Sequence, residues 1–393
     1  MLPNGWKKVK LGDIATISSG STPLRSNKAY FENGNMPWVK TMDLTNGKIT
    51  KTDECITELA AKKCKPYPPG TVLVAMYGGF NQIGRTGLLT FPASINQALA
   101  ALQFDKDICS EYVLFYLNAN VNCWRSCAAS SRKDPNITSH DVEKFKIVLP
   151  PLEEQKKIAE ILATQDRVIE LKEKLIAEKQ SQKKYLSQML LTGKKRVGDY
   201  KDHWEYSALS NYLTIKDVRQ IPNDEAPLMA FIAGMGGSPK GERYDRSFLV
   251  KNDKKEYKRT DLNDFIYSSN NLDVGSIGLN SYGSASISVV YEIFSVNSNA
   301  VPVVLSSIIQ LPENLNYALR FRQGAIYGQY RIYAEDFLSM KIKIPSLPEQ
   351  KAIADVLSAA DEEISLLQKD LEQEKLKKKS LMQLLLTGLV RVQ

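Results

Sequence analysis

The sequence predicts an α+β protein in which two globular domains are joined by two long helices that pair with each other. The stretches 150–197 and 345–392 repeat one another without a gap, and each has the pattern of one long helix. Short β-rich runs, separated by Gly, Pro and Asn, precede each stretch. The chain has 393 residues, 43% of them hydrophobic, which is enough for two or three domains with real cores. We therefore expect a domain in 1–148, a helix in 149–197, a domain in 198–343 and a helix in 344–393.

The first domain is expected to mix strands with helices. Residues 71–77 (TVLVAMY) have the composition of a buried strand, and 107–119 (DICSEYVLFYLNA) that of a helix. Three apolar residues near its start return 198 residues later at the start of the second domain: Trp6, Leu11 and Ile17, then Trp204, Leu209 and Ile215. Between such anchors the two copies diverge almost completely, so we expect two variable domains with shared flanks.

The first long helix is expected between the prolines at 150 and 151 and a glycine at 193. Proline suits the first turn of a helix, and a carboxylate there, Glu154, interacts favourably with the helix dipole. Gly193 fits a left-handed C-cap. About 38 residues without Gly or internal Pro would extend over roughly 57 Å.

The second domain and helix follow the same plan. Runs at 285–294 and 341–344 predict strands, Ser346 and Glu349 fit a capping box, and Gly388 fits the C-cap. Apolar residues recur at helical spacing along both helices. They are Ile158, Leu162, Ile169, Leu175 or Ile176, Leu186 and Leu190, and then Ile353, Leu357, Ile364, Leu367, Leu371, Leu381 and Leu385. A narrow apolar stripe on a charged rod needs a partner helix, and the other copy is the obvious candidate.

Composition bounds the possible functions. The net charge of +8 and the pI near 9.0 favour a polyanionic partner, most often nucleic acid. The N-terminus has no apolar signal-peptide region, and no run of about 18 apolar residues could span a membrane. We therefore expect a cytoplasmic protein whose five cysteines are reduced thiols, and no metal site, because no C-x-x-C pair is present.

Motifs that suggest catalysis fail on inspection. Residues 79–86 (GFNQIGRT) have the glycine spacing of a phosphate-binding loop, but Arg85 replaces the lysine and a strand-like run follows instead of a helix. Glu256-Tyr257-Lys258 has the E-x-K of many nucleases, a pattern that arises by chance in most charged chains. No methyltransferase or dinucleotide motif is present, and only two histidines are available for acid–base chemistry. No catalytic residue is therefore predicted.

Loops dense in hydrogen-bonding side chains remain as candidates for DNA binding. Arg can pair bidentately with guanine and Asn or Gln with adenine, while Lys and Ser suit phosphates. The candidates in the first domain are Ser19, Thr22, Asn81, Gln82, Arg85, Arg132 and Lys133. Those in the second domain are Arg219, Gln220, Lys240, Arg243, Asn270, Asn271, Arg320, Arg322 and Arg331.

The repeated pattern P-x-x-E-Q-x-x-I-A-x-x-L, a long helix, and L-L-T-G-x-x-R-V resembles the specificity (S, or HsdS) subunit of type I restriction-modification systems. The openings also fit: Gly5-Trp6 with Leu11-Gly12-Asp13-Ile14, and His203-Trp204 with Leu209. The second opening departs from the pattern, with Ser210-Asn211-Tyr212 where the first has Gly-Asp-Ile. The resemblance covers nearly the whole chain.

The resemblance implies two target-recognition domains that each read one half of a split DNA site, spaced by two helices in an antiparallel coiled coil. It implies double-stranded DNA, two methyltransferase subunits and restriction subunits as partners. S-adenosylmethionine, ATP and Mg would belong to those partners, so no cofactor is assigned to this chain. Two rivals stay open from the residues alone: an enzyme that acts by itself on DNA, and a coiled-coil scaffold with no DNA role.

Overall fold

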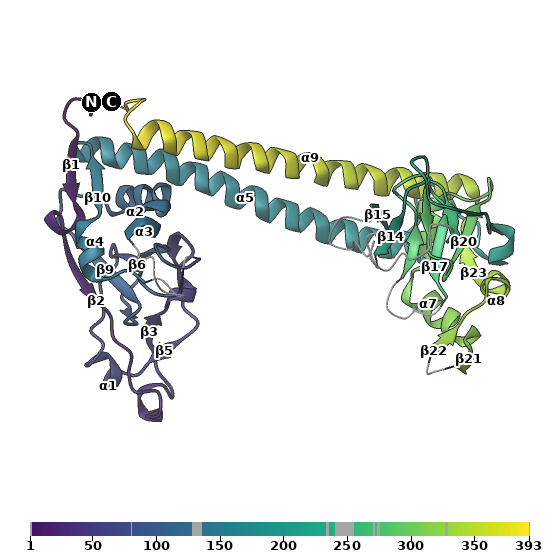
Figure 1. The fold of residues 1–393 in the computed structure, drawn as a ribbon, viewed down its shortest axis with the longest axis horizontal. Helices are drawn as coiled ribbons and strands as arrows, with labels where there is room; N and C mark the ends of the chain where they lie inside the picture. Colours follow the sequence, from purple (N-terminus) through teal and green to yellow (C-terminus); the bar gives the residue numbers. More distant parts are fainter. Residues whose placement is uncertain are drawn as a thin grey trace. The chain divides into compact units, whose positions relative to one another are not determined.

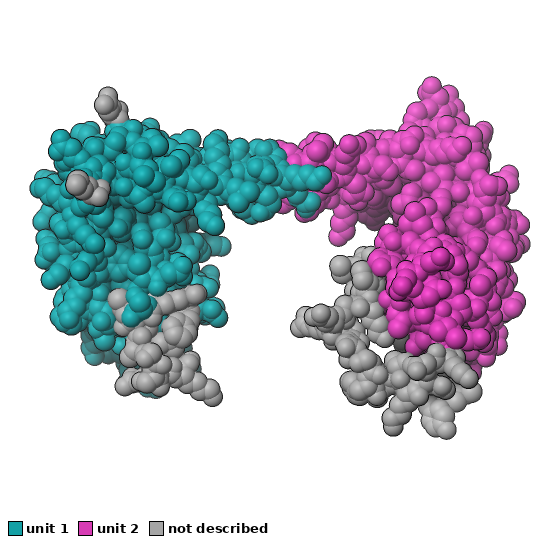
Figure 2. Space-filling view, turned by 45° about the horizontal axis from the view of Figure 1, so that its top comes forward, with its two compact units in different colours: residues 1–174, 368–393 teal, residues 175–367 magenta. Residues whose placement is uncertain are grey.

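The computed structural model describes residues 2–79, 81–127, 136–232, 236–239, 255–269, 272, 276–326 and 329–392. The chain forms two compact units (Figure 2). Unit 1 contains residues 1–174 and 368–393, and unit 2 contains residues 175–367. Each unit therefore combines one globular domain with one part of each long helix.

Two helices of equal length dominate the chain, as the repeat predicts. Helix α5 is Leu152–Leu191 and helix α9 is Leu347–Leu386, 40 residues each. Each ends in a left-handed glycine, with φ of +69° at Gly193 and +73° at Gly388, which confirms the predicted C-caps. Glu349 does not form the predicted capping box. Its two carboxylate oxygens instead accept hydrogen bonds from Arg196 and Trp204.

The two helices pair antiparallel within each unit. In unit 1, Gln165 Nε2 donates to Glu374 Oε2 over 2.7 Å, and Asp166 pairs with Lys378 at 2.5 Å. Residue numbers thus rise along α5 as they fall along α9, and the Lys172–Asp370 pair continues the register. In unit 2, Lys179–Glu363 (2.6 Å) and Lys183–Asp361 follow the same order. The expected coiled coil is therefore present, flanked by ion pairs.

The apolar stripe lies mostly on the buried side of each helix. Ile158, Leu162, Leu190, Ile353, Leu357, Ile364, Leu371 and Leu385 are buried, and Ile169, Leu186, Leu367 and Leu381 are partly buried. Where periodicity left two choices, Ile176 is buried and Leu175 is 39% exposed. Near the helix ends the stripe also joins the core of a domain, because Ile158 and Leu162 share one cluster with Val72 and Tyr112.

Unit 1 is built around a five-stranded sheet in the order β2-β9-β6-β7-β4, antiparallel except for the β4–β7 pair (Figure 1). The strands are β2 (Ala15–Ser19), β4 (Gly47–Ile49), β6 (Val72–Ala75), β7 (Thr86–Leu89) and β9 (Leu99–Phe104). A small sheet contains β3 (Met36–Val39), β5 (Cys55–Ile56) and β8 (Ser94–Ile95), and a ribbon pairs β1 (Lys7–Lys10) with β10 (Lys146–Leu149). The helices are α1 (Glu58–Ala61), α2 (Ser110–Ala119), α3 (Val121–Cys127) and α4 (Ser139–Lys144).

Unit 2 contains a four-stranded antiparallel sheet in the order β12-β20-β17-β18. These strands are β12 (Leu213–Ile215), β17 (Phe265–Ser268), β18 (Ile277–Leu279) and β20 (Tyr291–Val296). Smaller sheets contain β13 (Arg219–Gln220), β16 (Tyr257–Thr260) and β19 (Ala285–Ile287), and the pairs β11 (Glu205–Ala208) with β23 (Lys341–Ile344), β14 (Met229–Ile232) with β15 (Gly236–Pro239), and β21 (Gln323–Ile326) with β22 (Gln329–Arg331). The helices are α6 (Pro302–Ile309), α7 (Pro312–Ala318) and α8 (Ala334–Ser339).

The two domains share a frame that their sequences conceal. In chain order and pairing, β2-β9-β6-β7 of unit 1 corresponds to β12-β20-β17-β18 of unit 2. Helix α2 then corresponds to α6, and the ribbon β1–β10 to β11–β23. The start of the second domain, whose sequence departs from the repeated pattern, keeps the same local structure. A 3-10 turn begins at Leu11 in one unit and at Leu209 in the other. The shared frame therefore places corresponding strands and helices beside the ends of the long helices.

Several local predictions are confirmed with shorter bounds. Strand β6 lies inside 71–77, helix α2 inside 107–119, and β23 covers 341–344. The run 285–294 is not one strand, because β19 and β20 are separated by a turn at 288–290. Among the described helices, none is both long enough and apolar enough to span a membrane.

Candidate nucleic-acid interface

A buried carboxylate fastens three distant parts of the chain in unit 1. Trp6 Nε1 donates to Glu154 Oε2 over 3.0 Å, while Arg391 donates to both carboxylate oxygens, from Nε over 2.7 Å and from Nη2 over 2.9 Å. Burial alone would raise the pKa of Glu154, but the hydrogen bonds from Arg391 and Trp6 outweigh it and keep that pKa below its ordinary value. We call these three residues the unit 1 clamp.

Unit 2 repeats the clamp with the other copy of each residue. Trp204 Nε1 donates to Glu349 Oε2 over 3.0 Å, and Arg196 donates to the two oxygens over 2.5 and 2.7 Å. The guanidinium carbon lies 5.7 Å from the tryptophan ring centroid in both clamps. In each clamp the glutamate begins one long helix and the arginine follows the end of the other. The Glu and Arg of the repeated motifs are thereby explained.

The glutamine of the repeated Glu-Gln pair ties each long helix to its domain. Gln155 Oε1 accepts from the backbone N of Cys109, just before α2, over 2.9 Å, and Gln155 Nε2 donates to Pro150 O over 2.9 Å. Gln350 accepts from Val301 N over 2.8 Å and donates to Pro345 O over 2.9 Å. Each domain is therefore tied to the start of its long helix by a buried glutamine side chain.

An alternating chain of five charges brings two predicted DNA-binding arginines into one network in unit 2. Arg219 pairs with Asp217 at 3.4 Å and Asp217 with Lys258 at 3.6 Å. Lys258 pairs with Glu292 at 2.9 Å, and Glu292 with Arg331 at 3.0 Å. Lys258 and Glu292 are buried, whereas the two terminal arginines are exposed. We call this set the unit 2 charge network.

The charge network restrains its two arginines to different degrees. Burial would raise the pKa of Asp217, but Arg219 and Lys258 outweigh that effect and lower it, so the carboxylate stays ionised. Arg331 also lies over the ring of Tyr333, 5.1 Å from its centroid. Glu292 and the Tyr333 ring therefore orient Arg331, whereas the exposed pair with Asp217 restrains Arg219 only weakly.

Sequence reasoning missed the middle of this network. The sequence identified Lys258 only as the lysine of the E-x-K pattern. In the structure Lys258 is buried and pairs with Glu292, whereas Glu256 is exposed. Asp217 and Glu292 lie far from Lys258 in sequence, and only their charge could have marked them. Within the described residues, no group of His, Cys, Asp or Glu side chains could hold a metal ion.

The other candidates of unit 2 are scattered. Gln220 Nε2 donates to Ser286 Oγ over 3.0 Å, beside the charge network. Arg320 and Arg322 lie over the rings of Tyr317 and Tyr330, 5.9 and 5.8 Å from their centroids. Four candidates lie outside the described residues: Lys240, Arg243, Asn270 and Asn271.

In unit 1 the candidates gather around the loop between β6 and β7. Asn81, Gln82 and Arg85 lie on this loop, and Arg85 Nε donates to Asn81 O over 3.2 Å. Ser19 Oγ lies 3.0 Å from Ser139 Oγ, whose hydroxyl reaches Met76 Sδ at the start of the same loop. Thr22 instead donates to Gln97, which is not part of this group. Arg132 and Lys133 lie outside the described residues. The loop leads into strand β7, as predicted, which removes the resemblance to a phosphate-binding loop.

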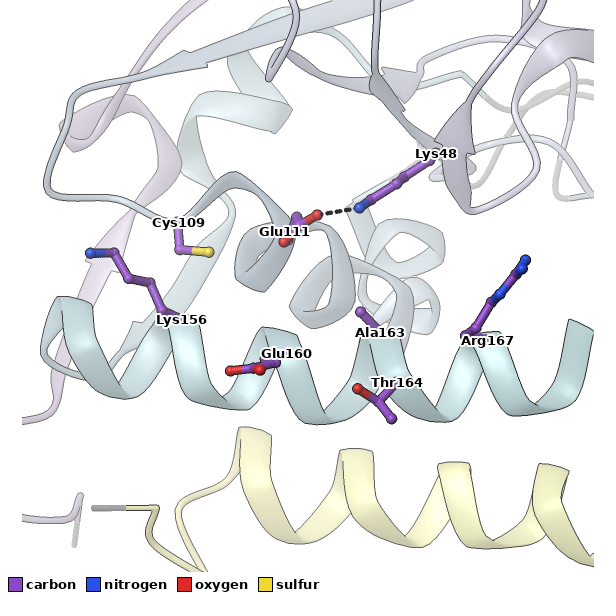
Figure 3. A pocket seen from close by; sticks show the side chains of 8 residues that line it. All are labelled: Lys48, Cys109, Glu111, Lys156, Glu160, Ala163, Thr164 and Arg167. Atoms are coloured by element: carbon purple, nitrogen blue, oxygen red, sulfur yellow. Dashed lines mark ion pairs between the residues drawn. The ribbon is translucent and has the colours of Figure 1, made fainter.

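A hollow of about 380 Å³ lies between α5 and the domain of unit 1 (Figure 3). Lys48 and Glu111 form an ion pair of 2.6 Å across its upper wall, and Ala163 and Thr164 leave space on the helix. Its charges are mixed, because Lys156 and Glu160 of α5 line the opposite wall. The hollow therefore offers no strong preference for a charged ligand.

Comparison with known proteins gives a consistent result for the sequence. The profile of the family described as the type I restriction modification DNA specificity domain matches residues 3–179 and 211–376. The putative type I restriction enzyme MjaX specificity subunit of Methanocaldococcus jannaschii is 26% identical over 419 residues, covering 100% of this chain and 95% of that relative. The EcoR124I/EcoR124II specificity subunit of Escherichia coli is 26% identical over 161 residues, covering 40% of this chain and 39% of that one.

Solved structures show the same fold. The HsdS subunit from Thermoanaerobacter tengcongensis superposes with a TM-score of 0.57 at 18% identity, and 98% of each chain is covered. A chain from a structure describing complex assembly and conformational transition of the type I R-M system gives a TM-score of 0.62 at 18% identity, again over 98% of each chain. The chain therefore belongs to the type I restriction-modification DNA specificity family, and it is a non-catalytic specificity subunit.

Proposed function

We propose that this chain reads a two-part DNA site, with each unit reading one half. The observation that carries the proposal is the repeated clamp: the same Trp, Glu and Arg hold each domain on the helices, while the polar faces of the two domains differ. One frame with two faces suits two different half-sites at a fixed spacing.

The two faces differ in the chemistry that they offer to base edges. Unit 2 presents Arg219 and Arg331 from the charge network, and arginine reads guanine through two parallel hydrogen bonds. Unit 1 presents Asn81 and Gln82, and amide side chains suit adenine. The net charge of +8 favours the phosphates of either half-site.

The helices have two further proposed roles: they set the spacing between the half-sites, and they dock two methyltransferase subunits. Some exposed residues at the helix ends are the same in both copies, as with Lys184 and Lys379 or Gln188 and Gln383, which fits the same partner docking twice. Restriction subunits would join this complex. S-adenosylmethionine, ATP and Mg would then act in the partner subunits, and this chain would bind none of them.

Exchange of one domain tests the proposal. Residues 11–146 are replaced by the corresponding domain of another specificity subunit, and methylated sites are mapped in cells that also carry the methyltransferase subunits. Because each clamp lies outside the exchanged segment, we expect one half-site to change and the other half-site and the spacing to stay. Exchange of 209–341 is the matched control and should change only the other half-site. If either exchange alters both half-sites, the units do not read independently and the proposal fails.

A further inference from the structure

A groove of about 1210 Å³ lies in unit 2, where the last turns of α5 approach the ribbon β11–β23 and helix α7. Small-molecule pockets have volumes of roughly 300–1,000 Å³. The groove is larger and partly open, so it has room for a peptide segment. Its lining combines positive charge with aromatic surface.

The positive charge of the groove is not paired with carboxylates of the described residues. Within the described part of the chain, its four exposed lysines make no ion pair: Lys184, Lys194, Lys341 and Lys343. The neighbouring Lys183, by contrast, pairs with Asp361 across the coiled coil. Among the described lining residues, Glu313 is the single carboxylate. An acidic partner would therefore gain attraction from these lysines.

Aromatic side chains give the groove an apolar floor. Tyr206 is 70% exposed and lies opposite Lys343 in the ribbon, with the ammonium 5.8 Å from its ring centroid. Trp204 of the clamp and Tyr317 of α7 also line the groove. An exposed aromatic residue such as Tyr206 is a typical anchor in protein interfaces, and the partly buried Trp204 and Tyr317 extend the apolar surface beside it.

The corresponding surface of unit 1, at the end of α9 and the ribbon β1–β10, also carries exposed lysines. Lys379 and Gln383 lie on α9 where Lys184 and Gln188 lie on α5, and all four are exposed. Thr387 and Thr192 directly follow the two helices, and Thr387 is exposed while Thr192 is partly buried. In the ribbons, Lys8 is opposite Val148 in unit 1, whereas Tyr206 is opposite Lys343 in unit 2. Both ribbons thus have one lysine at this pair of positions, on the first strand in unit 1 and on the second strand in unit 2.

The groove lining contains neither arginine of the charge network, although Arg320 lies over the ring of the lining residue Tyr317. Arg331 belongs to β22, and Figure 1 places β21 and β22 at the end of the domain away from α9. The groove, by contrast, is bounded by α5 itself. Because the groove is lined by a helix end whose residues Lys184 and Gln188 recur in α9, and not by the variable domain alone, we favour a protein occupant over DNA.

We propose that the groove binds an acidic segment, with an apolar anchor, of the methyltransferase subunit, and that a second copy of the segment binds the matching face of unit 1. This inference rests on the proposed function, from which it takes two identical partner subunits. It adds the surface and the chemistry of the contact.

Charge reversal in the full chain tests the inference. Variant A carries Lys184→Glu and Lys343→Glu, variant B carries Lys8→Glu and Lys379→Glu, and variant AB carries all four. The control carries Lys51→Glu and Lys106→Glu, two exposed lysines that belong to neither face, with the same change in net charge as variant A. Binding of the purified methyltransferase subunit is followed by calorimetry at low salt, and duplex DNA binding by anisotropy.

Wild type should bind two subunits. We expect A and B each to retain one site at full affinity and to lose at least tenfold at the other, AB to lose both, and the control to match wild type. Thermal unfolding checks that the variants fold, and Lys184→Ala with Lys343→Ala should show a smaller loss in the same direction. If A binds two subunits like wild type, or loses DNA affinity while keeping both subunits, the groove proposal is overturned and the proposed function stands. If wild type binds no methyltransferase subunit, the proposed function itself fails.

Discussion

At the scale of single residues, the clamps show how a charged side chain can be both buried and structural. Glu154 is 6% exposed, yet Trp6 and Arg391 satisfy its oxygens with three hydrogen bonds. A buried carboxylate without partners would be costly, so the three residues depend on one another. The clamp also joins segments close to the two ends of the chain, because Arg391 donates to Asn4 O over 3.2 Å.

Glu154→Gln should destabilise unit 1 by about 2 kcal/mol, because charge-assisted hydrogen bonds of roughly 1.5–3 kcal/mol are lost. Urea-induced unfolding measures the change. The matched control is Glu170→Gln on the same helix, where the carboxylate forms only surface pairs with Arg167 and Lys174, and little change is expected. Equal effects of the two substitutions would show that the clamp does not stabilise the unit.

The stabilisation by Glu154, measured as the difference in unfolding free energy between wild type and Glu154→Gln, should depend on pH. The pKa of Glu154 in the folded protein lies below its ordinary 4.5, so its stabilisation is fully present above about pH 4.5 and is lost as the pH falls through the folded pKa. The difference in unfolding free energy between wild type and Glu154→Gln should therefore shrink between pH 6 and pH 3. A difference that grows on acidification would contradict the assigned ionisation.

At the scale of elements, the sequence predicts the long helices better than the sheets. Prolines and glycines mark the helix ends within two residues, because the chemistry of caps is local. The four-stranded sheet common to both domains was not predicted, since its strands are three to six residues long and their pairing is not local. For the same reason the candidate site was predicted as single polar residues, and the buried Lys258–Glu292 pair that connects Arg331 to Arg219 was missed.

Helix α5 is also part of the domain core, which changes what a seam substitution should do. Leu162 is fully buried in the cluster that contains Val72 and Tyr112, so Leu162→Asp would put a charge into domain 1 as well as into the coiled coil, at a cost of several kcal/mol. Hydrogen exchange should show lost protection in α2 and the first part of α5, while unit 2 keeps its protection.

Leu171→Asp on the same helix is the control, because Leu171 is 48% exposed and should tolerate a charge. If Leu162→Asp leaves domain 1 protected and disturbs only the pairing of α5 with α9, the helix is a separate rod, as the sequence alone suggests. If both substitutions are tolerated, the predicted apolar stripe does not stabilise unit 1.

At the scale of the whole molecule, duplication explains why the repeated motifs stand at both ends of each helix. The arginine that follows α5 serves the glutamate that begins α9, and the arginine that follows α9 serves the glutamate that begins α5. Neither repeat completes its own clamp. Each clamp therefore needs both copies of the repeat. A change in the length of one helix must be matched in the other if both clamps are to form.

The proposed role of the helices in setting the spacing predicts the effect of such a matched change. Seven residues inserted after Lys174 and seven after Leu367, the limits of the units, keep the apolar stripe nearly in phase. Each insertion adds roughly 10 Å at about 1.5 Å per residue. DNA rises about 3.4 Å per base pair, so the gap between half-sites should widen by up to about three base pairs. Those pairs also rotate the far half-site by roughly 100°, at about 10.5 pairs per turn. Weaker binding with a smaller change of gap therefore remains consistent. Methylation mapping reads the gap directly, and an insertion in α5 alone is the control that should abolish assembly. Recognition of the original gap by the doubly lengthened protein would show that the helices do not set the spacing.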